Sequence, residues 1–262
     1  MSNSYHLYLT SSQAFLRTRS GMPWSRTIAQ LGEWRWDASA PASLQLPIAK
    51  SPARRRPQLH VYAGSGLCKF MTLALPSGLR DHDERTALVQ AQMQRQLGIN
   101  GSDWEFTFDT GPAEVNTIAC ALRRPVLERI HELSTEYGLR LMSVKPFVAG
   151  VWNAFRNRHA SPPEAESVLI AIEDDAYTVL VARSTTLKAM STLSHRGEHG
   201  LVEREVKRLG LSAGANAHDI RLAISQSVTS LAKDRATMIL QKRDYLQLAL
   251  YPDFRDLLFT GD

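Results

Sequence analysis

Residues 167–192 read SVLIAIEDDAYTVLVARSTTLKAMST, and this stretch decides the fold class. Three short runs within it, Ser167–Ile172, Thr178–Ala182 and Thr186–Thr192, are rich in apolar and β-branched residues. Such runs are typical of strands, and the few polar residues between them are typical of tight turns. The stretch therefore predicts three short consecutive strands joined by tight turns.

The same kind of run occurs in the N-terminal part of the chain. Two pairs of strands are expected there, with Thr10–Gln13 as the turn in the first pair and Gly64-Ser65-Gly66 between the strands of the second. The four runs are Tyr5–Leu9, Ala14–Thr18, Leu59–Tyr62 and Leu67–Leu75.

Residues 20–58 are rich in proline and tryptophan. They contain five prolines and three tryptophans, and proline removes a backbone donor that regular structure needs. We expect only short elements linked by loops in this segment. One of them is a helix from about Ala42 to Lys50, which Pro47 interrupts.

Helical signals alternate with the remaining strand signals. Asp83 is expected to cap a helix over Arg85–Leu97 that ends at Gly98. Pro125 opens a second periodic segment, which ends at Gly138. The order of elements predicts a mixed α/β protein with flanking helices. The other expected elements are strands Trp104–Phe108, Thr117–Leu122, Leu139–Val144 and Ile220–Ile224, and helices Phe147–Phe155 and Leu201–Leu209.

A polar, proline-rich segment, His159–Glu164, follows these helices and strands. Segments of this composition often separate compact units. We therefore expect a first lobe at residues 1–158, a linker at residues 159–166 and a shortened second lobe at residues 167–262.

Composition places the chain among globular proteins. Of its 262 residues, 44% are apolar and 22% are charged, so a large core can form. The net charge is +5, and the excess of basic residues is spread along the chain. The first residues lack the features of a signal peptide, and no apolar run reaches the roughly 20 residues of a membrane span. We therefore expect a soluble, cytoplasmic chain.

The two cysteines, Cys68 and Cys120, each lie in an apolar, strand-like run. Free cysteine is commonly buried, so we expect two buried, reduced thiols. Two thiols also fall short of the four ligands of a structural zinc site.

Two short motifs resemble ligand sites but lack essential parts. Tyr62–Gly66 contains G-x-G after a strand, yet a strand follows instead of the helix that a dinucleotide site needs, which favours a hairpin turn. His195–His199 places two histidines four residues apart, but Gly197 disfavours the helix that would bring them together. A solvated loop is the simpler interpretation.

The acidic triplet Glu173-Asp174-Asp175 follows the first strand of the opening stretch. Adjacent carboxylates can hold Mg²⁺, whereas Asp is also favoured in ordinary turns. We favour the turn, with Asp174, Asp175 and Thr178 as weak candidates for a nucleotide–Mg²⁺ site.

The densest basic run is Arg54, Arg55 and Arg56, between two prolines. It is a candidate basic contact loop for an anionic partner. No stacking platform or helix-turn-helix pattern accompanies it, so we favour a solvated loop and expect no nucleic acid.

The order of elements from Leu59 to Arg158 resembles a known family. It is similar to the actin-like assembly proteins of type IV pilus and type II secretion inner-membrane platforms, the PilM-like proteins and the cytoplasmic domains of GspL-like proteins. The resemblance rests on the strand pair ending in Leu73–Pro76, the helix after it, the glycine turn Glu136–Leu141 and the helix Pro146–Phe155. It implies a degenerate actin-like, ribonuclease H-like architecture of two lobes.

The chain departs from this family where an actin-like ATPase binds phosphate. The resemblance implies an Asp-x-Gly type loop at the start of each lobe, but the first turn reads Leu9–Ala14, with neither Asp nor Gly. The second turn, Glu173–Thr178, keeps acidic residues and a threonine but lacks the glycine. The resemblance also implies a Gly-Gly turn late in the chain that borders the nucleoside, and here that position reads Ser225-Gln226. We therefore expect no ATPase activity and no required cofactor, and weak ATP–Mg²⁺ binding stays open.

The resemblance implies a non-catalytic cytosolic scaffold of a pilus or secretion platform, peripheral at the inner membrane. Its implied partners are an inner-membrane protein, through a short cytosolic peptide, and the assembly ATPase; a homodimer is also open. Two alternatives remain from the residues themselves. One is a nucleotide-binding ATPase that uses Asp174, Asp175 and Thr178, and the other is a basic nucleic-acid-binding protein that uses Arg54–Arg56.

Overall fold

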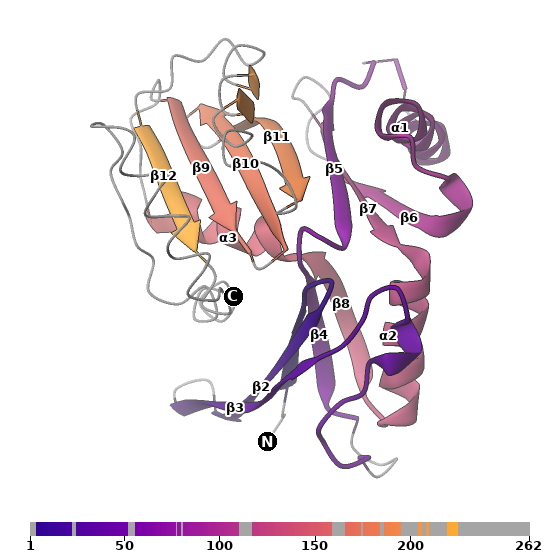
Figure 1. Ribbon diagram of the computed structural model, residues 1–262, viewed down its shortest axis with the longest axis vertical. Helices are drawn as coiled ribbons and strands as arrows, with labels where there is room; N and C mark the ends of the chain where they lie inside the picture. The colour runs from indigo at the N-terminus through magenta and orange to yellow at the C-terminus, as the bar shows by residue number, and fades with distance from the viewer. Residues whose placement is uncertain are drawn as a thin grey trace.

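In the part of the chain that the computed structural model describes, three β-sheets and three α-helices form the molecule (Figure 1). This part comprises residues 4–22, 25–51, 56–76, 78–79, 81–109, 117–158, 166–173, 175–183, 186–194, 204–205, 208–209 and 219–224. The mixed α/β class predicted from the sequence is confirmed.

A five-stranded sheet with the order β3-β2-β1-β4-β8 contains the N-terminus. β1 pairs antiparallel with β2 and parallel with β4, and β4 pairs parallel with β8. The first predicted strand pair is confirmed. The strands are β1 (Ser4–Leu9), β2 (Gln13–Met22), β3 (Ser25–Arg35), β4 (Gln58–Ala63) and β8 (Arg140–Pro146).

Two expectations for residues 20–58 were wrong. β3 is an 11-residue strand, because pairing with β2 overrides the weak alternation of its sequence. No helix forms over 42–50, where the described structure has only the 3₁₀ turn Pro41–Ser43. Instead, the Arg129 guanidinium donates to the Leu44 carbonyl (Nη2···O 2.9 Å), and Leu44 itself is fully buried, so this segment is held against α2.

A three-stranded antiparallel sheet, β5-β7-β6, follows in the chain. It consists of β5 (Cys68–Leu73), β6 (Trp104–Phe108) and β7 (Thr117–Arg123), and helix α1 (His82–Leu97) packs against it through Val89 and Met93. The N-cap of α1 is Asp81, whose carboxylate accepts from the amide of Asp83, so the expected cap at Asp83 was two residues late.

The stretch quoted first forms three strands of a four-stranded sheet with the order β11-β10-β9-β12. Each strand of the stretch pairs antiparallel with its sequence neighbour, and β12 pairs parallel with β9. Val168–Ile172 and Ala176–Ala182 are buried on both faces, which explains their nearly continuous apolar sequence. The strands are β9 (Glu166–Ile172), β10 (Ala176–Arg183), β11 (Thr186–Ser194) and β12 (Asp219–Ile224).

Two further helices pack on these sheets. α2 (Arg124–Glu136) contacts β7 and β8 and buries Val126, Ile130 and Leu133 completely. α3 (Phe147–Arg158) begins where β8 ends. Within the described residues, no helix is long and apolar enough to cross a membrane.

The proposed linker 159–166 and the expected helix 201–209 fall largely outside the described residues. The division into lobes at residues 158 and 167 therefore stays a prediction.

Two glycines that follow helices offer a matched test of how closely the backbone of Ser51 approaches the end of α2. Gly98 and Gly138 both have left-handed backbones, with φ of 63° and 64°. A Cβ on Gly98 would meet nothing within 4 Å, whereas one on Gly138 would lie 2.7 Å from the Ser51 carbonyl oxygen. Gly98→Ala should lower the free energy of unfolding by about 1 kcal/mol, and Gly138→Ala by roughly 2–3 kcal/mol, in urea titrations. Equal losses would contradict this placement of Ser51.

Candidate functional site

A buried carboxyl joins the four-stranded sheet to a strand and a turn of the preceding part of the chain. Glu173, directly after β9, is 0% exposed. The Tyr8 hydroxyl donates a hydrogen bond to its Oε1 (2.7 Å), and the Ser65 amide donates to its Oε2 (2.8 Å). Tyr8 lies on β1, and Ser65 lies in the turn between β4 and β5. One side chain therefore ties three distant segments together.

A second carboxylate makes a parallel contact in this junction. The Ser11 amide, in the turn between β1 and β2, donates to Asp175 Oδ2 (2.6 Å). The turns also meet directly, since the Gly64 amide donates to the Leu9 carbonyl (2.6 Å). We call the contacts of Glu173 and Asp175 with Tyr8 of β1 and with these two turns the carboxylate clasp.

The clasp explains both glycines of the motif Gly64-Ser65-Gly66. A Cβ on Gly66 would lie 2.2 Å from Asp175 Oδ2, and one on Gly64 would lie 2.8 Å from the Leu9 carbonyl oxygen. Both positions need the absence of a side chain, because backbone and carboxylate approach so closely. The predicted hairpin is wrong, because β4 pairs with β1 and β8 while β5 pairs with β7 in another sheet. The segment is a turn that leads from one sheet to the other and receives the carboxylates.

Burial and like charge oppose ionisation of Glu173. Its pKa is raised from 4.5 to about 7, first because the carboxyl is removed from water and second because Asp175 is close. Donors from Ser65 and Tyr8 partly offset this rise. The group therefore changes its protonation state near neutral pH while it lies in the centre of the junction.

The weak nucleotide candidates do not form one described cluster. Asp175 lies in the clasp, but Thr178 is buried in β10 and its hydroxyl lies 3.0 Å from that of Thr192 on β11. Asp174 lies outside the described residues. Across the described ranges, no group of three or more His, Cys, Asp or Glu side chains is arranged to hold a metal ion.

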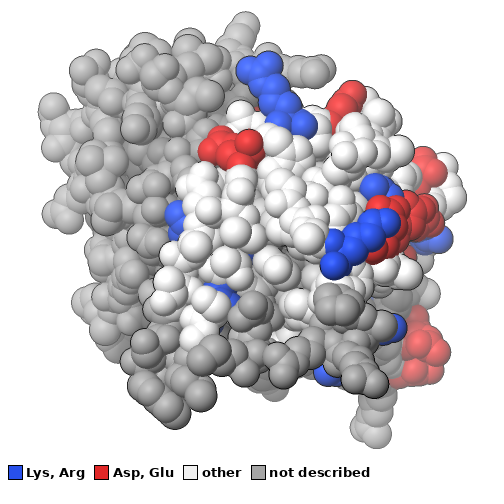
Figure 2. Space-filling model, turned by 90° about the horizontal axis from the view of Figure 1, so that it is seen from below, with Lys and Arg blue, Asp and Glu red and all other residues white. Residues whose placement is uncertain are grey.

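The other sequence candidates are only partly described. Arg56 is exposed, in keeping with a solvated loop, whereas Arg54 and Arg55 lie outside the described residues, as do His195–His199 and Ser225-Gln226. Figure 2 shows one face on which the described Lys and Arg side chains are scattered among uncharged and acidic ones.

Both cysteines are buried free thiols, as predicted. The Cys68 pKa lies well above its usual value, because of a hydrogen bond with Cys120 and then burial. The two thiols line a cavity of about 220 Å³ between β4, β8 and the three-stranded sheet.

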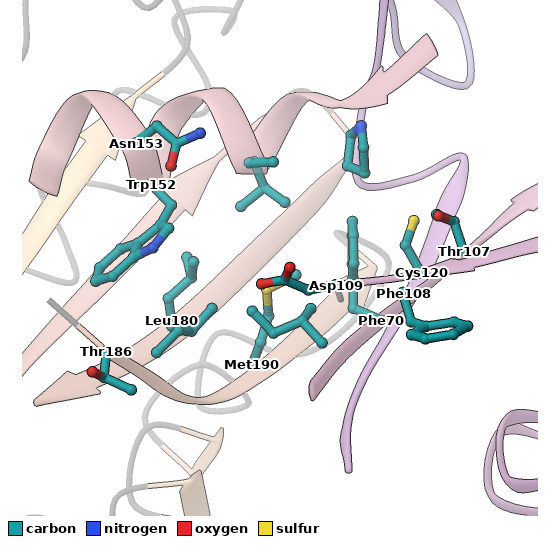
Figure 3. A pocket seen from close by; sticks show the side chains of 15 residues that line it. Phe70, Thr107, Phe108, Asp109, Cys120, Trp152, Asn153, Leu180, Thr186 and Met190 are labelled. Atoms are coloured by element: carbon teal, nitrogen blue, oxygen red, sulfur yellow. The ribbon is translucent and has the colours of Figure 1, made fainter. Parts of the chain in front are cut away.

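A larger cavity, of about 470 Å³, lies where all three sheets approach α3 (Figure 3). Trp152 and Asn153 of α3 line it from one side, and Leu180 and Met190 of the four-stranded sheet line it from another. The three-stranded sheet adds Phe70, among other residues. The lining is mostly apolar, and the edge strand β11 contacts β5 beside it. We call this cavity the α3 groove.

Sequence reasoning missed the α3 groove, because its walls come from several segments that are far apart in the chain. It also missed the clasp, since Tyr8 and Ser65 carry no local signal of a partner more than 100 positions away. The only usable signal was the pair of glycines that flank Ser65.

Comparison with solved structures defines the fold. A protein of unknown function from Bacteroides thetaiotaomicron with an actin-like ATPase fold superposes with a TM-score of 0.71 at 9% identity, over 100% of this chain and 96% of that chain. No protein-family model matches the chain, and a sequence comparison with characterised proteins finds no match.

Two further similar structures come from assembly machines. The PilM–PilN type IV pilus biogenesis complex gives a TM-score of 0.55 at 14% identity, over 94% of this chain and 87% of that chain. The second is the cytoplasmic domain of EpsL, an inner-membrane component of the type II secretion system of Vibrio cholerae. It gives a TM-score of 0.53 at 11% identity, over 93% of this chain and 97% of that chain. The chain has the actin-like fold, and structures similar to it include pilus and secretion components, as the resemblance implied.

Replacing Glu173 by Gln should change how stability depends on pH. Because the folded chain holds the proton more firmly than the unfolded chain, the wild-type free energy of unfolding should fall as pH rises through about 7. The pKa rise corresponds to roughly 3 kcal/mol at full ionisation. Glutamine cannot ionise, so the variant should lack this fall in urea titrations between about pH 5 and about pH 8.

A control for the pH experiment is Glu105→Gln, which removes an exposed carboxylate that pairs with Arg124. This variant should keep the wild-type profile, because exposed pairs contribute little. Parallel profiles for wild type and Glu173→Gln would show that Glu173 does not titrate in the junction.

Proposed function

We propose that this chain is a non-catalytic scaffold of a pilus or secretion type assembly platform, which binds a peptide segment of a membrane partner. The observation that carries the proposal is the carboxylate clasp. In an actin-like fold, the turn between β1 and β2 is where a nucleotide-binding member needs free amides for phosphate. Here the Ser11 amide already donates to Asp175.

Charge and space at the clasp both disfavour a nucleotide. A phosphate group placed against Ser11 or Ser65 would meet the carboxylates of Asp175 and Glu173 at hydrogen-bond distance. Like charges at such a distance repel, and the buried surroundings strengthen the repulsion. Gly64 and Leu9 also close the junction by direct backbone contact. The residues present therefore do not fit the ATP–Mg²⁺ that the ATPase alternative requires.

The α3 groove is the proposed peptide site. It combines a mostly apolar lining with an aromatic residue, Trp152, and a carboxylate, Asp109. An apolar slot with a few polar groups is the usual form of a site that takes a short helix or an extended segment. One similar structure is the PilM–PilN complex of type IV pilus biogenesis, which supports a partner of this kind.

The proposed location is the cytoplasmic side of the inner membrane, where the chain would be held by its partner. One similar structure is the cytoplasmic domain of an inner-membrane secretion component, which supports this location. The net charge of +5 favours a position beside anionic lipid. Contact with an assembly ATPase belongs to the same proposal.

Thermal melting with and without Mg²⁺-ATP tests the absence of a nucleotide site. At millimolar nucleotide and matched ionic strength, the melting temperature should change by less than about 1 °C, because a ligand stabilises only what it binds. A rise of several degrees would favour the ATPase alternative over the scaffold.

Filling the α3 groove should abolish peptide binding without unfolding the chain. Ala149 is exposed at the groove, so Ala149→Trp adds bulk to the site and not to the core. Fluorescent peptides that cover the short cytosolic segments of membrane proteins encoded beside this chain are the probes. The variant should lower the affinity for a peptide that binds the wild type by roughly tenfold or more.

The matched control is Met142→Trp, which adds the same side chain at an exposed position on β8 outside the groove. It should leave peptide affinity unchanged. Equal peptide affinities for Ala149→Trp and wild type would show that the peptide binds outside the α3 groove. If none of the peptides binds the wild type, the proposal of a membrane partner is contradicted.

A further inference from the structure

The outer part of the β2–β3 hairpin is uncovered on both faces. Thr27–Leu31 of β3 are five consecutive exposed residues, although successive side chains of a strand point to opposite faces. Ile28 (43% exposed) and Leu31 (38%) are two of the four exposed large apolar side chains in the described part of the chain. The hairpin reaches the margin of the molecule in Figure 1, so a large, flat partner has access to it.

The same segment is basic and lacks acidic residues. The first acidic residue of the whole chain is Glu33, and three arginines precede it. Glu33 lies opposite the buried Phe15 at the inner end of the hairpin, whereas Arg19 lies opposite Ile28 farther out. The outer part of the hairpin therefore combines positive charge with exposed aliphatic side chains. The three arginines are Arg17, Arg19 and Arg26.

We propose that the outer part of this hairpin, Arg19–Met22 of β2 and Ser25–Leu31 of β3, lies against an anionic lipid surface. Exposed apolar area and basic charge together are what bind a protein surface to anionic headgroups. The inference deepens the proposed location at the membrane, and rests on it, by naming the surface that faces the lipid. The α3 groove contains no residue of β2 or β3, so the two sites are separate.

The outer edge of β3 sets how deep the hairpin lies. β3 is the outermost strand of its sheet, and no strand among the described residues pairs with its outer edge. Backbone groups without partners are excluded from hydrocarbon, whereas water and headgroups satisfy them at the interface. The hairpin therefore stays at the level of the headgroups. A contact of this kind is reversible, which suits a chain that a membrane partner also holds.

Nucleic acid is the competing partner for a basic hairpin. Contacts with its phosphates would use the arginines but would give Ile28 and Leu31 no apolar surroundings. A lipid interface accommodates both kinds of side chain, because apolar groups reach the acyl-chain boundary while basic groups stay beside the phosphates. The exposed aliphatic residues therefore favour lipid.

Cosedimentation of the intact chain with lipid vesicles tests the proposal. Wild type should bind vesicles of phosphatidylglycerol and phosphatidylcholine at least roughly tenfold more tightly than vesicles of phosphatidylcholine alone, and binding should weaken as salt rises. Leu31→Glu should weaken binding by roughly tenfold, because it replaces an apolar contact by a repelled charge. No β2 residue lies opposite Leu31, since the register shifts there, so the substitution breaks no cross-strand pair.

Leu97→Glu is the matched control. It makes the same substitution at the last residue of α1, far from the hairpin in Figure 1, and Leu97 has the same exposure as Leu31, 38%. This variant should bind vesicles like wild type. Leu31→Trp should strengthen binding by roughly threefold or more, because tryptophan favours the membrane interface. A gain of affinity does not arise from a loss of folding.

Three results would overturn the proposal. They are a wild type that binds no anionic vesicles, equal weakening by Leu31→Glu and Leu97→Glu, and tight binding to duplex DNA without binding to vesicles. The last result would assign the hairpin to nucleic acid. The vesicle assay contains no peptide, so these results would leave the proposed peptide site in the α3 groove untouched.

Discussion

The junction between the sheets depends on how the buried Glu173 carboxyl is held. A carboxyl with no exposure is costly unless its oxygens have donors, and Tyr8 and Ser65 supply one to each oxygen. These donors fix β1 and the turn after β4 against the end of β9. Gly64 and Gly66 are required in consequence, because any side chain there would collide with the Leu9 backbone or with Asp175.

The same contacts connect the fold to its proposed role. The amide of Ser11, in the turn where we expect a nucleotide-binding protein of this fold to need free amides, is engaged by the chain's own Asp175. The open space lies instead at the α3 groove, between α3 and the sheets. Closure at one place and an apolar groove at another are the two features that support the proposed peptide-binding scaffold.

Local sequence patterns predicted most of the fold. The strands in residues 167–192, the first strand pair and the helices beginning near Pro125 and Phe147 follow from apolar runs and end signals. The strands β4 and β5 were also foreseen, but not that they lie in different sheets and do not pair with each other. β3 was not foreseen, because its stability comes from pairing with β2. The candidate site was foreseen only in part: Asp175 was named from its acidic neighbours, whereas the roles of Tyr8 and Ser65 depend on contacts between distant segments.

The amide resonances of Ser11 and Ser65 in an isotope-labelled chain test the carboxylate clasp most directly. Both amides donate to carboxylates of the clasp, so their chemical shifts report what they bind. The account predicts that the Ser65 resonance moves with a midpoint at about pH 7, with Glu173, and that neither resonance moves when ADP is added. Resonances that do not move with pH but do move when ADP is added would contradict the account.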